Sequence, residues 1–578
     1  MSEEAVTRPP RRRAAGGSAL RLISLLVLLV GAGLYLRELW RDLDPARLRG
    51  VFVPLAPLGL PAELEPAPDL GVPPGAAVGR DVVLVTLDTT RPDRLGLYGN
   101  RAIETPTLDR LGREGVVFSR AVATASATLP AHASILTGLY PHGHGARANA
   151  VFVADSTRPT LAEILAAHGY DTAAFVSSFA LDARFGLDRG FAVYDDEMRR
   201  TGASLSFSER RGDETTERAV AWLRSPRARP YFLWVHYYDP HASYDPPEPY
   251  ASRCANPYDG EIAFMDAQLG RLLDAVDAAS RRAPLVVVTA DHGEGLGEHG
   301  EDSHSYLVQE ATIQIPWILR ADGVLPRGRR IDGRASQVDL MPTLLSLLGI
   351  DAPAGLHGGD WTRALDPNRA VLAETVEGRV NFGWRRLSAL YLGDAKLVSG
   401  ARPALYDLTR DPTESRDVAA ENPQAVARLE SRLRALRRGE PELLVPTTGA
   451  RGDDTTQPLA ALGYIVTEAR SMPASGPGPD PRDLMAAMDR LLLVVDAPAN
   501  ADAIPTWVRL VAWMKGIELP RTDEEAIAVL EAMAERDPDF APTFYFLALY
   551  YNRTNRAEDA ARTLERLDAV KRAASGAG

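Results

Sequence analysis

The sequence predicts an α/β fold with a mostly parallel central sheet flanked by helices, an N-terminal membrane helix and a small all-α module at the C-terminus. Short, almost wholly apolar runs alternate with amphipathic segments between residues 81 and 290, as in parallel sheets whose strands are buried on both faces. Acidic residues and histidines follow several of these runs, at the strand ends where open α/β sheets bind ligands. Residues 22–36 form a separate, uncharged apolar run.

The composition is that of a folded chain with several domains. Of the 578 residues, 45% are hydrophobic and 25% are charged, which is ordinary for globular proteins. The net charge is −12 and no basic block follows residue 21, so we expect no nucleic acid partner. Cys254 is the sole cysteine, which excludes an intramolecular disulfide and a cysteine-based metal site.

Residues 1–40 are expected to hold a cytoplasmic tail and a signal anchor. Five arginines precede the apolar run, and no Ala-x-Ala cleavage site follows it. The run is short for a membrane span, although Leu39 and Trp40 could extend it; a cleaved signal peptide and a buried helix are the alternatives. Residues 41–80 form a proline-rich linker. We therefore expect a membrane-anchored protein whose catalytic domain is extracytoplasmic, either periplasmic or extracellular.

The expected catalytic domain, residues 81–440, begins with a strand at residues 81–87 that delivers Asp88 at its C-terminal end. Two further strands end in polar residues: one leads into the segment from His236 to His241, and the other into Asp291 and His292. These two strands are predicted at residues 231–235 and 284–290, and a further strand at 170–176. Helices are predicted at 159–168, 213–223 and 260–279.

Thr128 is the candidate nucleophile. It lies immediately ahead of a predicted helix in which Pro130 suits the first helical position and residues 131–136 are helix-compatible. Free backbone N–H groups and the positive end of the helix dipole would then face Thr128 and a bound anion. The alternative is that Thr128 only caps the helix.

A metal site is expected where the strand ends meet. Asp88, Asp291, His292 and the Thr128 oxygen offer three oxygen ligands and one nitrogen ligand. A histidine ligand suits zinc or manganese better than calcium, which prefers oxygen ligands throughout. The alternative is a set of polar turns at strand ends with no ion.

Several stretches, taken in order, resemble the sulfatase family of the alkaline phosphatase superfamily over residues 81–438. They are VLVTLDTTRPDRLGLYGN (83–100), TPTLDRLGREGVVFSRA (105–121), TLPAHASILTG (128–138), PTLAEILAAHGYDTAAFV (159–176), YDGEIAFMDAQLGRLL (258–273), TADHGEGLGEHG (289–300) and LYDLTRDPTESRDVA (405–419). The resemblance implies that Asp88, Asp291 and His292 bind a metal and that Thr128 is the nucleophile. It also implies that Asn149, His241 and His304 contact the transferred group.

The sequence departs from that family at its central motif. Standard sulfatases carry Cys-x-Pro-x-Arg, whose cysteine becomes formylglycine, whereas this chain has Thr128-Leu-Pro-Ala-His132. No formylglycine can form, and His132 is a further candidate catalytic residue. A Thr nucleophile with an Asp-His pair resembles the phosphodiesterase and phosphotransferase branches of the superfamily. Those branches often hold a second metal, for which Asp239, His241 and His304 are candidates and His236 a weaker one; hydrogen-bonding roles are the alternative.

Residues 441–482 are expected to be a linker and residues 483–578 a helical module. A 34-residue offset relates Glu525, Ala526, Leu530 and Glu531 to Asp559, Ala560, Leu564 and Glu565, which is the tetratricopeptide period. Trp507 would lie in the preceding copy. Because two helical pairs are few for independent stability, the module is expected to pack on the catalytic domain or to bind a protein partner; a generic helical hairpin is the alternative.

The predicted function is hydrolysis of phosphate or sulfate esters through Thr128 with a divalent metal. Phosphate esters are favoured because Thr128 lacks the second hydroxyl with which formylglycine hydrate expels sulfate. The substrate would be a small-molecule, glycan or lipid ester. Two alternatives stay open: a phosphotransferase that modifies a surface lipid or glycopolymer, and a non-catalytic scaffold that binds partners through the helical repeats.

Overall fold

The computed structural model describes residues 68–149, 154–198, 209–242, 244–445, 470–497 and 519–574. The apolar run at residues 22–36, most of the proline-rich linker and Trp507 lie outside these residues. No helix in the described ranges is both long enough and apolar enough to cross a membrane. Every element described below lies within the compact unit Leu60–Gly578.

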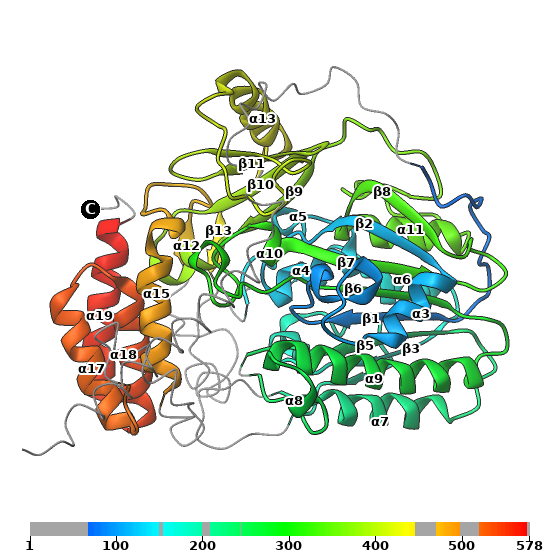
Figure 1. Cartoon of the computed structure of the whole chain (residues 1–578), viewed down its shortest axis with the longest axis horizontal. Coiled ribbons are helices and arrows are strands. Elements are labelled where there is room, and N and C mark those ends of the chain that lie inside the picture. Colours follow the sequence, from blue (N-terminus) through cyan, green and yellow to red (C-terminus); the bar gives the residue numbers. More distant parts are fainter. Residues whose placement is uncertain are drawn as a thin grey trace, which may run out of the picture. The chain divides into compact units, whose positions relative to one another are not determined.

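An eight-stranded sheet forms the centre of the second unit (Figure 1). Its strands, in spatial order, are β4 (Val193–Asp195), β3 (Asp171–Phe175), β5 (Tyr231–Tyr237), β1 (Val82–Leu87), β6 (Leu285–Ala290), β7 (Gln314–Arg320), β2 (Val116–Val122) and β8 (Arg329–Ser336). Strand β7 runs antiparallel to both of its neighbours, and the other adjacent pairs are parallel. The sheet is therefore mixed, a detail that apolar runs cannot reveal because they are the same in either direction.

Helices cover both faces of the sheet. On one face, α3 (Pro106–Glu114), α7 (Gly212–Leu223) and α9 (Pro257–Ala279) pack against Val83 and Val85 of β1. On the other face, α4 (Thr128–Thr137), α6 (Leu161–Ala167) and α11 (Leu340–Leu347) join the core that contains Val82 and Leu84. Alternate residues of β1 thus face opposite cores, which explains why its sequence is continuously apolar.

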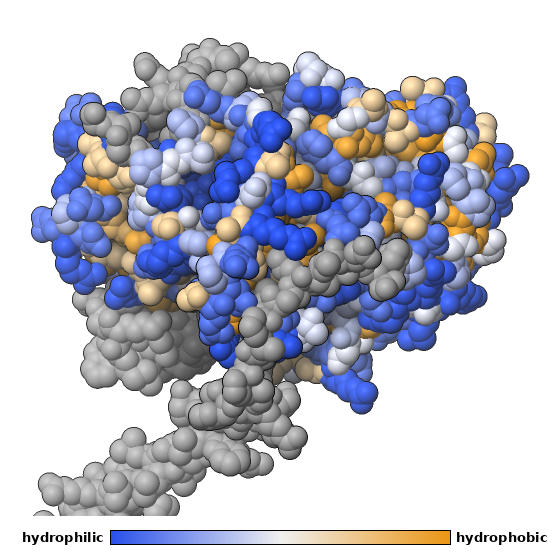
Figure 2. Space-filling model, turned by 90° about the horizontal axis from the view of Figure 1, so that it is seen from above, coloured by the Kyte–Doolittle hydropathy of each residue, from blue (hydrophilic) through white to orange (hydrophobic). Residues whose placement is uncertain are grey.

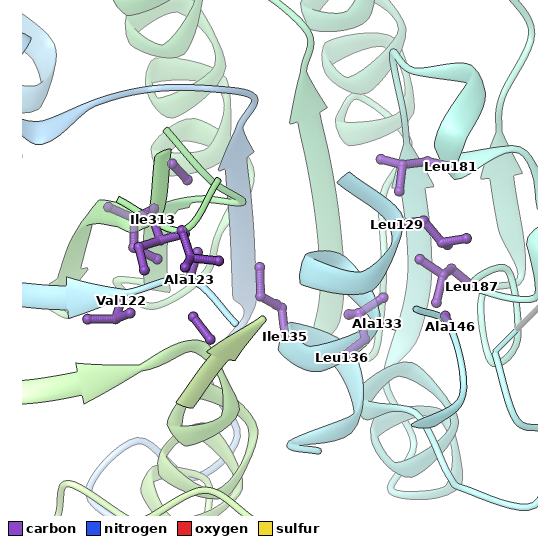
Figure 3. Packing of buried hydrophobic residues seen from close by; sticks show 14 of the residues in the cluster. Val122, Ala123, Leu129, Ala133, Ile135, Leu136, Ala146, Leu181, Leu187 and Ile313 are labelled. Carbon is purple, nitrogen blue, oxygen red and sulfur yellow. The ribbon is translucent and has the colours of Figure 1, made fainter. Parts of the chain in front are cut away.

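Helix α4 is buried along its whole length. Its apolar side chains pack with Val122, Ala123, Leu181, Leu187 and Ile313 (Figure 3). It ends at Gly138, whose φ of 66° is the left-handed conformation that favours glycine. A helix enclosed in this way has a fixed axis, so the residue at its first position is also fixed.

A second sheet, which the sequence did not predict, follows the first. Its four antiparallel strands are β9 (Val371–Thr375), β10 (Leu387–Leu392), β11 (Ala395–Ser399) and β12 (Ala404–Asp407), and its helices are α12 (Glu377–Phe382) and α13 (Pro423–Leu436). An isolated bridge between Ala125 and Glu374 joins β9 to the segment that leads into α4. The second sheet therefore reaches the segment that carries the candidate nucleophile.

Short elements complete the catalytic region. They are α5 (Pro141–His144), α8 (Tyr250–Arg253), α10 (Glu310–Ile313), and the 3₁₀ turns η2 (Pro92–Arg94), η3 (Gly96–Tyr98), η4 (Phe179–Leu181), η5 (Ala183–Phe185), η6 (Glu298–Gly300) and η7 (Gln337–Asp339). Part of the expected linker is ordered, since β13 (Leu443–Val445) pairs with β14 (Arg470–Met472).

The C-terminal region contains the helices α15 (Pro481–Asp496), α17 (Asp523–Arg536), α18 (Ala541–Arg553) and α19 (Ala557–Ala574). Helices α17 and α19 begin 34 residues apart, at Asp523 and Ala557, which agrees with the offset in the sequence. The assignment as tetratricopeptide repeats stays a prediction.

The surface of the described residues is mainly polar. Figure 2 shows one face on which hydrophilic residues predominate and apolar residues are scattered in small groups. Among the described residues, the large hydrophobic side chains that are exposed are Val78, Val193 and Leu436. The apolar residues of this region are thus used mainly in its cores.

Candidate active site

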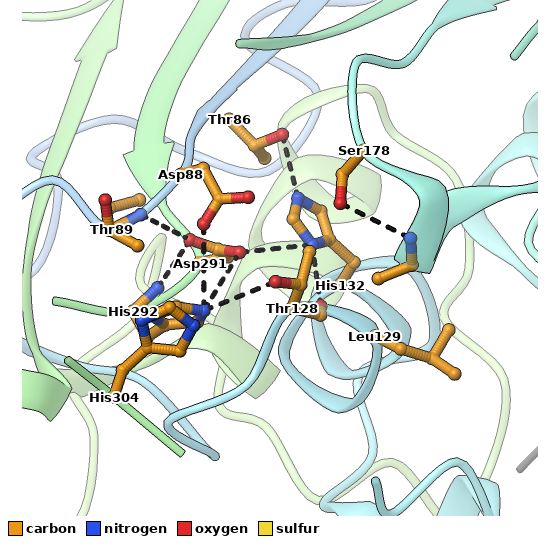
Figure 4. A network of polar contacts seen from close by, with 12 residues as sticks. Thr86, Asp88, Thr89, Thr128, Leu129, His132, Ser178, Asp291, His292 and His304 are labelled. Atoms are coloured by element: carbon orange, nitrogen blue, oxygen red, sulfur yellow. Dashed lines mark hydrogen bonds and ion pairs between the residues drawn. The ribbon is translucent and has the colours of Figure 1, made fainter. Parts of the chain in front are cut away.

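Three neighbouring strands deliver the candidate metal ligands to one place. Strand β1 lies between β5 and β6, and Leu87 is in register with both Tyr237 and Ala290. Asp88, the first residue after β1, therefore lies beside Asp291, the first residue after β6. Figure 4 shows the resulting cluster of carboxylates and histidines at the start of α4.

Asp291 and His292 are held in fixed orientations. Asp291 Oδ1 accepts hydrogen bonds from the backbone N–H of Thr89 (3.2 Å) and of His292 (2.7 Å). The His292 Nδ1–H donates to the carbonyl oxygen of Gly293 at 2.9 Å, so the Nε2 lone pair is turned toward the cluster. A Cβ at Gly293 would lie 2.1 Å from the Ala311 carbonyl oxygen, which explains why glycine follows this histidine.

Two buried carboxylates lie beside each other with oxygen atoms that accept no hydrogen bond from the described residues. Within the described ranges, Asp88 Oδ1, Asp88 Oδ2 and Asp291 Oδ2 have no hydrogen-bond partner, and both side chains are fully buried. Burial raises the pKa of each carboxyl group. An uncompensated pair of this kind is costly in an apolar interior, whereas a divalent cation between the two carboxylates would remove the cost.

The donor atoms fit such a cation. Asp88, Asp291 and His292 each offer one ligand atom, and these atoms all lie within 4.8 Å of one another. Thr128 Oγ1 is 3.4 Å from His292 Nε2, which adds a fourth oxygen or nitrogen donor at the same point. His292 is oriented through its second ring nitrogen, as metal-binding histidines usually are. The set of three oxygens and one nitrogen is the one that the sequence predicted.

Thr128 is the first residue of α4 and not its cap. Ala127 occupies the cap position. The backbone N–H of Leu129 donates to Asn149 Oδ1 at 2.8 Å, Pro130 has no N–H, and that of Ala131 donates to the Ala127 carbonyl. The N–H groups of Leu129 and Ala131 are therefore not the free groups that the sequence predicted at the start of this helix.

A histidine pair borders the cluster on the side opposite α4. The ring of His304 lies 4.4 Å from that of His292 and 5.0 Å from that of His241. The His304 Nδ1–H donates to Glu294 Oε1 at 2.9 Å, and Tyr244 donates to Glu294 Oε2 at 2.8 Å. His241 stacks on Tyr238 and its Nδ1–H donates to the Ala242 carbonyl. Both rings thus keep Nε2 available for a substrate.

The sequence reasoning missed Glu294. This carboxylate is fully buried, and burial raises its pKa to about 7. It lies two residues after His292, in the segment that follows an apolar strand, so its place next to a candidate ligand was a signal that could have been used.

His132 has a different role from the one expected. Its Nδ1–H donates to the carbonyl oxygen of Thr128 at 2.8 Å, and its Nε2 accepts from Thr86 Oγ1 at 2.9 Å. Burial lowers its pKa to about 3, so the ring is neutral. With both nitrogens engaged, His132 supports the first turn of α4 and is not free to contact a transferred group.

Asp239 also has a partner outside the cluster. Asp239 Oδ2 accepts from the Gly212 N–H at the start of α7 (2.8 Å), and it belongs to neither of the two groups of described residues that could hold a metal. The second group consists of His132, His236 and Asp291, in which His236 Nε2 is 3.3 Å from Asp88 Oδ2. The structure thus places His236, and not Asp239, beside the first cluster.

Comparison with known proteins identifies the class. Residues 80–350 match the family model described as Sulfatase. The match runs from β1 to α11 and includes every element that carries the cluster. Relatives of this region are named as a sulfatase and as an alkaline phosphatase superfamily protein, and the chain is an ester hydrolase.

Individual relatives are distant. The chain is 26% identical to an uncharacterized sulfatase, YidJ, of Escherichia coli over 57% of its own length and 81% of the relative. It is 25% identical to the multifunctional alkaline phosphatase superfamily protein PehA of Trinickia caryophylli over 59% and 91%. The phosphonate monoester hydrolase of Agrobacterium radiobacter superposes with a TM-score of 0.53 at 23% identity, over 62% of this chain and 96% of that one; this likeness shows the fold alone.

Proposed function

We propose that this protein hydrolyses phosphate esters, with Thr128 as the nucleophile and a divalent cation held by Asp88, Asp291 and His292. The observation that carries the proposal is the Thr128 hydroxyl, 3.4 Å from His292 Nε2, beside two buried carboxylates of which three oxygens have no hydrogen-bond partner in the described residues. When bound, the cation supplies positive charge that favours the ionised hydroxyl and offsets charge on the substrate oxygens. Zinc or manganese suits this donor set better than calcium.

The side chains around Thr128 then have distinct tasks. Thr128 Oγ1 attacks phosphorus, the bond to the ester oxygen breaks, and the proton of the threonine hydroxyl ends on the departing alcohol. His241 and His304 line the side of the cluster away from α4, where the non-bridging oxygens would lie. Because Glu294 accepts from His304 Nδ1–H, the opposite nitrogen of that ring is placed to take a proton from water. That water opens the phosphothreonine, which releases phosphate and restores Thr128.

The preference for phosphate over sulfate rests on the chemistry of Thr128. The named relatives include sulfatases and an alkaline phosphatase superfamily protein, so they do not decide between the two esters. A threonine has a single hydroxyl and cannot expel a sulfate group by elimination, as a hydrated aldehyde can. Its sulfate ester would need attack of water on sulfur, whereas a phosphothreonine can be opened in line.

A panel of nitrophenyl phosphate, bis-nitrophenyl phosphate and nitrophenyl sulfate tests this proposal. We expect the highest kcat/KM on one of the phosphorus esters, loss of that activity in Thr128→Ala, and partial retention in Thr128→Ser, which keeps a hydroxyl. A sulfate kcat/KM above both phosphorus values, and lost in Thr128→Ala, would refute the preference. Mass spectrometry of the products with glycerol present separates hydrolysis from transfer, because a transferase would form glycerol phosphate.

A further inference from the structure

We propose that helix α12 positions Thr128 and His304, and that the C-terminal helices hold α12 in place through Tyr545. Glu377, Phe382 and Tyr545 are then positioning residues for the proposed hydrolysis, on which this inference rests. The argument follows two sets of contacts from α12 to the two sides of the site, and a third from α12 to α18.

The first set leads from the start of α12 to the nucleophile. Glu377 is buried, and its Oε1 accepts from the backbone N–H of Asn149 at 2.6 Å. Asn149 Oδ1 in turn accepts from the N–H of Leu129 at 2.8 Å, the residue after Thr128. Two hydrogen bonds therefore connect α12 to the first turn of α4. The Asn149 side chain thus links the two segments by accepting from the Leu129 N–H.

The second set leads from the same end of α12 to His304. The backbone N–H of Glu377 donates to Thr375 Oγ1 at 3.3 Å, and the Thr375 hydroxyl donates to the carbonyl oxygen of Ser305. Ser305 has a φ of 91°, a conformation that costs energy for a residue with a side chain. Contacts on both sides of Ser305 are therefore needed to keep His304 where it is.

Tyr306 supplies the contact on the other side of Ser305. Its backbone N–H donates to Glu301 Oε1 at 2.9 Å, and its ring lies 5.9 Å from Phe382 and 5.4 Å from Trp384. Phe382 is the last residue of α12. The loop that carries His304 is thus tied to both ends of this one short helix.

The C-terminal helices meet α12 at this aromatic group. Tyr545 of α18 lies edge to face against Phe382 with ring centroids 5.6 Å apart, and Phe540 lies 6.4 Å from Trp384. Helix α18 also carries Tyr551, which is buried but directed into the helical module, where its hydroxyl bonds Glu531 of α17. Two tyrosines of one helix therefore differ in whether they reach the catalytic domain.

The burial of Glu377 supports a positioning role over simple packing. Burial raises the pKa of this carboxyl group to about 7, so ionised Glu377 costs folding free energy near neutral pH. An apolar residue would fill the same space without that cost. What Glu377 adds is an acceptor for the Asn149 N–H and for the Asn381 side chain, whose Nδ2 donates to Oε2 at 3.1 Å.

The test compares full-length Tyr545→Ala with Tyr551→Ala, and Glu377→Ala with Glu377→Gln. The substrate is the nitrophenyl ester that the wild type cleaves fastest. We expect Tyr545→Ala and Glu377→Ala to lower kcat by roughly tenfold to a hundredfold, which is the effect of a small displacement of the reacting groups. KM should change less than kcat. Tyr545→Phe and Glu377→Gln should recover most of the rate, because the ring and one acceptor oxygen remain. Tyr551→Ala should keep the wild-type kcat.

Hydrogen exchange gives a second measurement that does not need turnover. We expect faster exchange of the Leu129 amide in Glu377→Ala and of residues 304–307 in Tyr545→Ala, but not in Tyr551→Ala. If no ester is cleaved, the proposed function fails while the exchange result still decides this inference. Equal kcat and exchange in Tyr545→Ala and Tyr551→Ala, or wild-type exchange at Leu129 in Glu377→Ala, would overturn it.

Discussion

Two clusters of buried acidic side chains differ in how their charge is compensated. We call Glu374, Glu440, Arg147, Arg386 and Arg437 the ion-pair cluster, and Asp88, Asp291, His292 and Thr128 the site cluster. In the ion-pair cluster, Glu374 Oε1 is 2.5 Å from Arg147 Nη2 and Oε2 is 2.9 Å from Arg437 Nη2. In the site cluster, three carboxylate oxygens have no hydrogen-bond partner in the described residues.

The pKa shifts of the two clusters have opposite signs. Burial alone would raise the pKa of Glu374, but the guanidinium groups of Arg147, Arg437 and Arg386 outweigh it and lower the pKa. Burial raises the pKa of Asp88 and Asp291, and the neighbouring histidines do not reverse it. In the first cluster the carboxylates are compensated by arginines of the chain, whereas the proposed function assigns the compensation of the second to a bound cation.

The largest expected effect is the loss of turnover when the site cluster is broken. Asp291→Ala removes charge that holds the proposed cation, whose electrostatic contribution of several kcal/mol corresponds to roughly a thousandfold in rate. We therefore expect kcat/KM to fall by at least that factor. Asp239→Asn is the matched control, because Asp239 lies at the same end of the sheet but bonds Gly212. An equal loss of kcat/KM in Asp239→Asn would show that turnover depends on this end of the sheet in general and not on the site cluster.

The free energy of unfolding should depend more on the ion-pair cluster than on the site cluster, which is the reverse of the order expected for turnover. Glu374→Gln leaves three arginines with Glu440 as their one counter-charge in the cluster, so the free energy of unfolding should fall by about 3–5 kcal/mol. Asp88→Asn in metal-free protein removes an uncompensated charge and should leave stability unchanged or raise it. Chemical denaturation of both variants measures this. A larger loss in Asp88→Asn than in Glu374→Gln would contradict the comparison.

The pH dependence of the free energy of unfolding tests the charge state of the ion-pair cluster, with a smaller expected effect. The folded pKa of Glu374 is lowered from its ordinary value of 4.5, so the unfolded chain binds the proton first as the pH falls. The contribution of Glu374 to stability is present above pH 4.5 and is lost as the pH falls toward the folded pKa. We expect the stability difference between wild type and Glu374→Gln to narrow from pH 6 to pH 3.5. A constant difference would show that Glu374 is not ionised in the folded protein.

The sequence was sufficient to predict the framework of the site. Continuous apolar runs identified β1, β5 and β6, and parallel strands that end together bring Asp88 and Asp291 side by side. Sequence alone could not predict that β7 is antiparallel, because an apolar run carries no direction. The second sheet was also not predicted from the sequence.

The contacts that tune the site were harder to predict, because they join residues distant in the chain. The contact of Asn149 with the transferred group stays a prediction, but its amide oxygen also accepts from the Leu129 N–H, which the sequence did not predict. Arg437, just beyond α13 in a segment with several exposed arginines, is largely buried against Glu374. Both outcomes depend on which partner the fold supplies, which local sequence does not encode.

Metal analysis of the purified full-length protein tests the central claim most directly. The site cluster predicts one tightly held divalent ion per chain in the wild type and in Glu374→Gln, and its loss in the double variant Asp88→Asn, Asp291→Asn. Elemental mass spectrometry after extensive dialysis measures the stoichiometry, and thermal unfolding confirms that each variant is folded. Wild-type protein that turns over substrate without metal, or a double variant that retains the full stoichiometry, would contradict the account.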